Sequence, residues 1–156
     1  MSSVLGGPTA GPMTVMKLLN EGKLVGYVSP FMIERLATKL SSDKIQRYIA
    51  RKFPGELARF RPYVMLNLYL QRARIVEPEV YVDASSDPED NEVLSVACEA
   101  GVDFVITLDN RDILNLRNPT TKEIIIEDED GNEVCRFKVM TPGEFLTELR
   151  NEGWLI

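Results

Sequence analysis

Residues 87–107 constrain the fold most strongly, because they set out a helix, its end and a buried strand in direct succession. Asp87-Pro88 are residue types that begin a helix, and Gly101 is the type that most often follows the end of one. The segment VDFVIT (102–107) is short and mostly apolar, as a buried strand is. A helix that leads directly into such a strand favours an α/β fold with parallel strands.

The rest of the chain continues this alternation. Helical patterns occupy 14–22, the stretch from Ser29-Pro30 to residue 40, 41–53 and 54–73, and a last helix begins at the capping-box pair Thr141 and Glu144. Short extended segments are expected at 24–28 and within 74–83, and 122–140 reads as a β-hairpin that turns at Asp130-Gly131. The sequence therefore predicts one α/β domain over 1–156, with a mainly parallel sheet and a C-terminal hairpin.

Composition removes several kinds of chemistry. The chain has no histidine, which excludes Ser-His-Asp and Cys-His nucleophiles and nearly all zinc sites. Cys98 and Cys135 stand singly on apolar faces, so we expect buried free thiols in a reducing cytoplasm. No apolar run approaches the roughly 20 residues of a membrane span, so no membrane association is expected.

Positive charge gathers between Arg35 and Arg74. Ten Lys and Arg residues face two acids there, a net +8 in a chain whose overall charge is -6. Such a block is either a solvated helical face or a surface that contacts a phosphate backbone. For the second interpretation the candidate contacts are Lys39, Lys44, Arg47, Arg51, Lys52, Arg59 and Arg61.

Asp90 lies in an unusual place on its predicted helix. At about 100° per residue it falls at the centre of the stripe formed by Val93, Leu94, Ala97 and Cys98. Asp87 and Glu89 are explained by helix capping and the helix dipole, but capping does not require an acid to face the core. A carboxylate directed at a sheet must be neutralised or bind a cation.

Further carboxylates are expected near Asp90. Asp109 and Asp112 follow the strand 102–107, at the carboxyl end where sites form in parallel sheets. The local alternative is that both residues only cap the next helix. Glu34 follows the strand 24–28 at helical depth and is a fourth candidate ligand. An oxygen-only cluster without histidine suits Mg²⁺ or Mn²⁺.

The block DPEDNEVLSVACEAGVDFVITLDNRDIL resembles the second half of a PIN domain. The segments VSPFMIERLATKL and VMTPGEFL are similar to two further parts of that family, and the resemblance runs from about Val4 to Leu149. It implies a three-layer α/β/α sandwich and Mg²⁺- or Mn²⁺-dependent cleavage of RNA, by a one-metal or two-metal mechanism. The family's acidic residues correspond to Glu34, Asp90, Asp109 and Asp112, and Thr107 would hold the loop or a water.

The resemblance also implies partners and leaves alternatives. Many members are toxins of toxin–antitoxin pairs, so an antitoxin protein and a homodimer are expected partners beside RNA. The family begins with a strand ending in Asp, whereas no Asp precedes Asp43 here. We therefore expect an in-frame upstream extension carrying that Asp, and weak or no activity without it. The alternatives are a non-catalytic PIN-like module that binds RNA or protein, and a receiver-like or phosphatase-like domain that phosphorylates an Asp.

Overall fold

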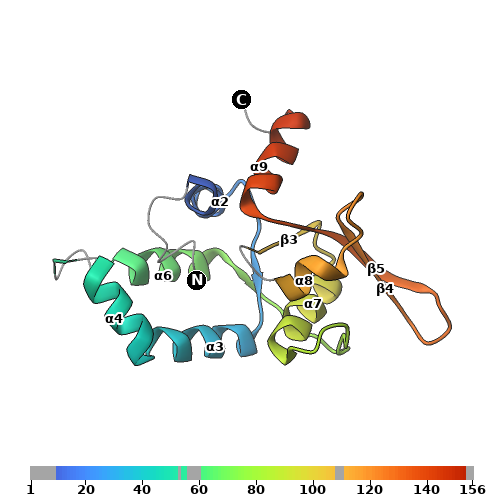
Figure 1. Ribbon diagram of the computed structural model, residues 1–156, viewed down its shortest axis with the longest axis horizontal. Coiled ribbons are helices and arrows are strands. Elements are labelled where there is room, and N and C mark those ends of the chain that lie inside the picture. Colours follow the sequence, from blue (N-terminus) through green and yellow to red (C-terminus); the bar gives the residue numbers. More distant parts are fainter. Residues whose placement is uncertain (1–9, 53, 56–60, 108–110, 154–156) are drawn as a thin grey trace. The chain divides into compact units, whose positions relative to one another are not determined.

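A computed structural model of the protein describes residues 10–52, 54–55, 61–107 and 111–153 (Figure 1). Contacts divide the chain into two compact units, residues 1–75 and 76–156. Within the described ranges, no helix has both the length and the apolar character that crossing a membrane requires.

The first unit is mainly helical. Its elements are α2 (Ala10–Asn20), β1 (Tyr27–Val28), α3 (Pro30–Leu40), α4 (Asp43–Lys52), α6 (Arg61–Arg72) and β2 (Arg74–Ile75). Each of these helices contributes a buried residue to one hydrophobic cluster: Met16, Leu40, Ile49 and Leu66. These four helices overlap the stretches predicted to be helical, but residues 54–55, at the start of the last predicted stretch, are not helical.

The strands of the first unit are shorter than the sequence predicts. β1 and β2 pair in parallel over two residues each, against expected extended segments at 24–28 and 74–83. Gly26 precedes β1, and a Cβ there would lie 2.8 Å from Cε2 of Tyr69, so the close approach requires glycine. Val25 and Ile75 are more than half exposed, so the buried strand is shorter than the apolar run predicts.

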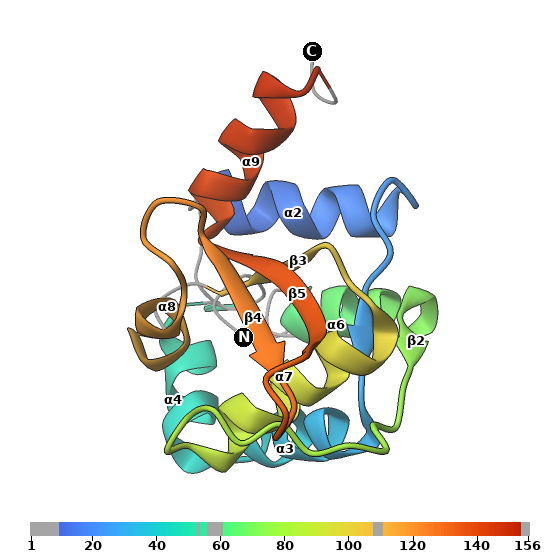
Figure 2. The ribbon, with the colours of Figure 1, turned by 90° about the vertical axis from the view of Figure 1, so that its right-hand side faces the viewer.

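The second unit is built on a three-stranded sheet. Its elements are α7 (Pro88–Ala100), β3 (Phe104–Ile106), α8 (Arg111–Leu116), β4 (Glu123–Glu127), β5 (Glu133–Met140) and α9 (Pro142–Asn151). β5 lies between β3, with which it is parallel, and β4, with which it is antiparallel (Figure 2). The predicted hairpin is confirmed, and its turn contains Gly131 at a φ of +82°.

Helices cover both faces of this sheet. On one face Val105, Phe137 and Val139 pack with Leu94 of α7 and Ile113 of α8. Because side chains alternate along a strand, Phe104 and Lys138 point to the other face. There the ring of Phe104 meets Phe145 of α9 at 4.9 Å, and Lys138 bonds Glu148 at 2.6 Å. The unit thus has the α/β/α layering that the family resemblance implies.

Helix ends lie where the sequence predicts them. The Asp87 carboxylate accepts from Glu89 N at 2.9 Å, and Gly101 ends α7 at a φ of +64°. Ser29 caps α3, and Thr141 and Glu144 form the predicted capping box of α9. These caps depend on neighbouring residues alone, which is why the sequence reveals them.

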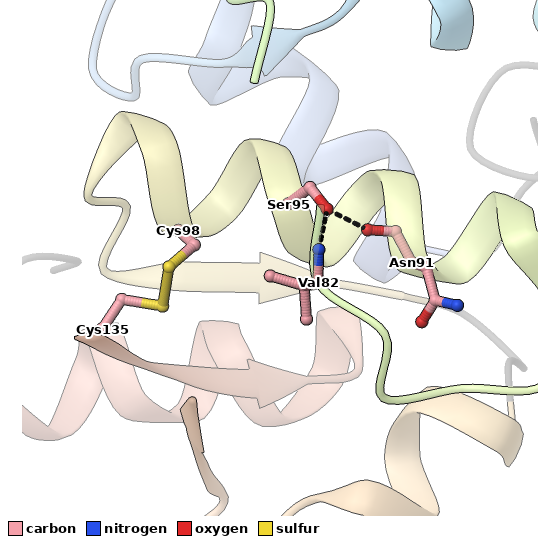
Figure 3. Close-up of a disulfide and its surroundings, with 5 residues drawn as sticks. All are labelled: Val82, Asn91, Ser95, Cys98 and Cys135. Carbon is pink, nitrogen blue, oxygen red and sulfur yellow. Dashed lines mark hydrogen bonds between the residues drawn. A yellow bond between two sulfur atoms is a disulfide. The ribbon is translucent and has the colours of Figure 1, made fainter. Parts of the chain in front are cut away.

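The prediction of free thiols is wrong. Cys98 of α7 and Cys135 of β5 form a disulfide, with Cα atoms 5.5 Å apart (Figure 3). The two residues are 37 positions apart and share no spacing motif, so only the packing of α7 against β5 reveals the pair. The bond closes a segment that contains β3, α8 and β4.

A charged cluster joins the start of α9 to the segment after α8. Arg117 bonds both carboxylate oxygens of Glu144, at 2.9 and 3.2 Å, and also donates to the Val139 carbonyl at 2.7 Å. Lys122 lies 3.1 Å from the same carboxylate. The Arg117 hydrogen bonds are the main cause that lowers the pKa of Glu144 to about 2, and the Thr141 amide and Lys122 contribute.

Reducing the disulfide should lower stability. A cross-link across 37 residues restricts the unfolded chain, which by loop-closure entropy corresponds to about 4 kcal/mol, and measured values are often smaller. We expect the free energy of unfolding in urea to fall by about 2–4 kcal/mol with reductant or in the Cys98→Ala/Cys135→Ala variant. Reductant should not affect that variant. Two thiols titrating in the native, unreduced protein would contradict the pairing.

Because of Glu144, the stability of the fold should depend on pH in the acidic range. Because its folded pKa lies below the ordinary value of 4.5, its contribution is complete above about pH 4.5 and is lost as pH falls toward 2. The Glu144→Gln variant can keep the cap hydrogen bonds but loses the charge. The difference in unfolding free energy between wild type and variant should therefore shrink between pH 6 and pH 3, each unfolded in urea. A difference independent of pH would contradict this assignment.

Candidate functional site

The first turn of α7 carries a buried acid. Asp90 is 4% exposed, as its place on the apolar stripe predicts. Its Oδ2 accepts a hydrogen bond from the Ser85 hydroxyl at 3.1 Å. The positive end of the helix dipole also favours an anion at this position. The helix dipole and the Ser85 hydroxyl thus offset part of the cost of burying a carboxylate at this position.

Asp90 lies toward the carboxyl end of β3. α7 is joined to β3 by the turn at Gly101, so the helix runs back along the strand. Figure 3 shows β3 pointing toward the side of α7 that bears Asn91, with Cys98 toward the opposite side. Thr107 follows β3 directly, and its backbone N–H donates to Met140 O at 3.0 Å. Asp90 and the carboxyl end of β3 therefore lie at the same end of the sheet.

The other predicted carboxylates differ in what the structure describes. Asp112 is exposed in the first turn of α8, whose Ile113 packs in the same core as Leu94. Asp109 lies outside the described residues. Glu34 is exposed on α3, which belongs to the first unit. Among the described residues, no group of three or more Asp, Glu, Cys or His side chains is close enough to hold a metal ion.

The donor set nevertheless has the chemistry that a hard cation requires. Asp90 offers a buried carboxylate in a chain without histidine, and both cysteines are in the disulfide. Carboxylate and hydroxyl oxygens suit Mg²⁺ or Mn²⁺ rather than zinc. In the second unit the predicted ligands of such an ion are Asp90 and Asp112, together with Asp109, which lies outside the described residues.

Two functional candidates on α7 are not among the residues that the sequence predicts. Asn91 and Ser95 are 2% and 1% exposed, and both bond the segment that precedes the helix. The Ser95 hydroxyl accepts from Val82 N at 2.8 Å and donates to Asn91 O at 2.6 Å (Figure 3). The Asn91 amide accepts from Ala84 N and Ser85 N. Asn91 and Ser95 are four residues apart and lie beside the apolar stripe, so the sequence alone places both on one flank of the helix. That shared position is the sequence feature that could have identified them.

The predicted nucleic-acid contacts lie partly on one helical face. Lys44, Arg47 and Arg51 of α4 are exposed and spaced by three and four residues, opposite Ile45 and Ile49 in the core of the first unit. Lys52 and Lys39 are exposed as well. Arg59 and the side chain of Arg61 lie outside what the structure describes. An exposed basic face of this kind can contact phosphates without reading bases.

Comparison with known proteins identifies the fold. Residues 2–111 match the family described as PIN domain, and the match crosses the division between the two units. The uncharacterized protein MJ1680 of Methanocaldococcus jannaschii is 26% identical over 146 residues, which cover 94% of this chain and 84% of that protein. No solved structure matches. The predicted PIN-like α/β fold with parallel strands is confirmed, and the chain belongs to the PIN domain family, whose members form a nuclease-like module.

Proposed function

We propose that the protein is a divalent-metal-dependent ribonuclease that cleaves phosphodiester bonds at the first turn of α7. The observation that carries this proposal is Asp90, a 4% exposed carboxylate whose Oδ2 accepts a hydrogen bond from a hydroxyl, in a chain of the PIN family. Helix capping does not need a buried acid at this position, because Asp87 already provides the cap. Binding of a cation would explain why an acid is buried at this position.

The residues have separate parts in the proposed reaction. Asp90, with Asp109 and Asp112, would hold Mg²⁺ or Mn²⁺, and a role for Glu34 as a further ligand stays a prediction from the sequence. Such an ion, when bound, activates a water and stabilises the departing oxygen. Thr107 keeps the carboxyl end of β3 attached to β5 through its backbone bond to Met140. The exposed cations of α4 would bind the RNA backbone and contribute little to the choice of sequence.

The alternative is a PIN-like module that binds RNA or protein without cleaving it. It is favoured by one observation, that no cluster of three acidic side chains occurs among the described residues. Metal binding separates the two functions, because only the nuclease requires it. The receiver-like or phosphatase-like interpretation is set aside by the family match. A toxin role, an antitoxin partner, a homodimer and a cytoplasmic location remain predictions.

The metal site can be tested by removing single charges. We expect Asp90→Asn and Asp109→Asn each to abolish Mn²⁺ binding, while metal-free stability stays equal or rises slightly because repulsion between acids is relieved. Isothermal calorimetry with Mn²⁺ and urea unfolding measure the two effects. Asp103→Asn is the matched control, because Asp103 is exposed and precedes β3. Unchanged Mn²⁺ affinity in both test variants would refute the shared site.

The basic face can be tested by the salt dependence of RNA binding. Each lost contact to a single strand should reduce the slope of log affinity against log salt by roughly 0.7, so Arg47→Ala/Arg51→Ala/Lys52→Ala should reduce it by about 2. The matched control removes three cations that are paired with Glu: Lys17, Lys23 and Arg136. Equal slopes in wild type and the α4 variant would identify these residues as an ordinary solvated face.

A further inference from the structure

The side-chain amide of Asn91, next to Asp90 on α7, is fully hydrogen-bonded. Its Oδ1 accepts from Ala84 N at 3.0 Å and Ser85 N at 2.8 Å, and its Nδ2 donates to Ser85 O at 2.8 Å and Tyr81 Oη at 3.1 Å. These bonds use the whole donor and acceptor capacity of an amide. Flipping the amide would turn its donor toward two backbone N–H groups, so its orientation is fixed.

The Asn91 amide holds Ser85 at two points. It accepts from the Ser85 N–H and donates to the Ser85 carbonyl, as a neighbouring strand would. Residues 76–87 form neither helix nor strand, so these bonds replace the pairing that a sheet would give. The backbone of Ser85 is therefore fixed relative to the first turn of α7, although it lies in a loop.

Ser85 passes this restraint to Asp90. Its Oγ accepts from Asp87 N at 3.2 Å, so its single proton is available for Asp90 Oδ2, 3.1 Å away. The backbone of α7 fixes only where the Asp90 side chain begins. The Ser85 hydroxyl then restricts how the carboxylate turns about its own bonds. The path from Asn91 to Asp90 thus consists of three hydrogen bonds and one serine.

We propose that Asn91 is a positioning residue for the Asp90 carboxylate, acting through Ser85, and that this arrangement sets the affinity of the site for a divalent cation. The inference rests on the proposed metal site. Neither Asn91 nor Ser85 needs to touch the ion. Groups that hydrogen-bond a metal ligand in this way commonly change metal affinity by about 10–100-fold.

Removing the Ser85 hydroxyl tests the last link. Ser85→Ala should weaken Mn²⁺ binding by about tenfold or more in calorimetry. The backbone of residue 85 should stay in place, because Asn91 still bonds its N–H and its carbonyl. Ser85→Thr keeps a hydroxyl and should restore most of the affinity. Ser86→Ala is the matched control, since Ser86 is the exposed neighbour and should bind Mn²⁺ as the wild type does.

Asn91 is tested by a double-mutant cycle. Asn91→Ala should weaken Mn²⁺ binding as much as Ser85→Ala does, and the double variant should lose no more than either single variant, because both act along one path. Asn91→Ala also leaves buried partners unsatisfied, so binding is measured at a temperature where circular dichroism shows it folded. Ser95→Ala is the control for loosening, because it releases Val82 but leaves the Asn91–Ser85 bonds in place. It should keep wild-type affinity.

The outcomes separate this inference from the proposed function. Wild-type Mn²⁺ affinity in Ser85→Ala would overturn the positioning role while leaving the metal site intact. Additive losses in the double variant, or an equal loss in Ser95→Ala, would show general loosening of the loop and would also overturn it. Absence of Mn²⁺ binding by the wild-type chain would refute the metal site itself, and the positioning role with it. If Asn91→Ala does not fold, the Ser85 variants decide.

Discussion

The second unit depends on how α7 satisfies the backbone of the segment before it. Val82 is buried in the core, but residues 81–87 belong to no strand, so their N–H groups need partners that a sheet does not supply. Asn91 and Ser95 provide these partners from one flank of the helix. The same helix uses its apolar stripe to pack on the sheet. One element thus anchors the core, holds the loop and presents Asp90.

This arrangement explains why a buried acid is tolerated in α7. A carboxylate that is only 4% exposed would be costly without compensation. Here it stands in the first turn, where the helix dipole favours an anion, and it accepts from a serine whose own position is fixed. The contacts of Asn91 and Ser95 with the loop lie on one flank of the helix, while Asp90 shares its stripe with Leu94 and Ala97, which pack in the core. The proposed metal ligand therefore stands at the start of the same stripe whose later residues stabilise the core.

The sequence predicts features that depend on neighbouring residues, such as helix caps, but it does not predict contacts between segments that are distant along the chain. Periodicity places Asp90 on the buried stripe, and the caps at Ser29, Asp87 and Thr141 follow from their neighbours. The role of Asn91 is not predicted, because its partners lie in the irregular segment before α7, and hydrophobic periodicity does not show where such a segment runs. For the same reason the sequence does not predict the disulfide between Cys98 and Cys135, which depends on the packing of α7 on β5. The strands of the first unit are shorter than predicted, because an apolar run does not show over how many residues it pairs with a neighbouring strand.

The disulfide adds a constraint to the proposed site that differs from the hydrogen bonds around Asp90. It links the last turns of α7 to β5, and the segment it closes contains Thr107, Asp109 and Asp112. The acid on α7 and those after β3 therefore belong to two segments that one covalent bond ties together. The hydrogen bonds of Asn91 and Ser85 restrict the Asp90 side chain directly, whereas the disulfide restricts the chain that carries the other acids. The first constraint limits the geometry of one ligand in the folded state. The second limits mainly the unfolded chain, so it should affect stability more than cation affinity.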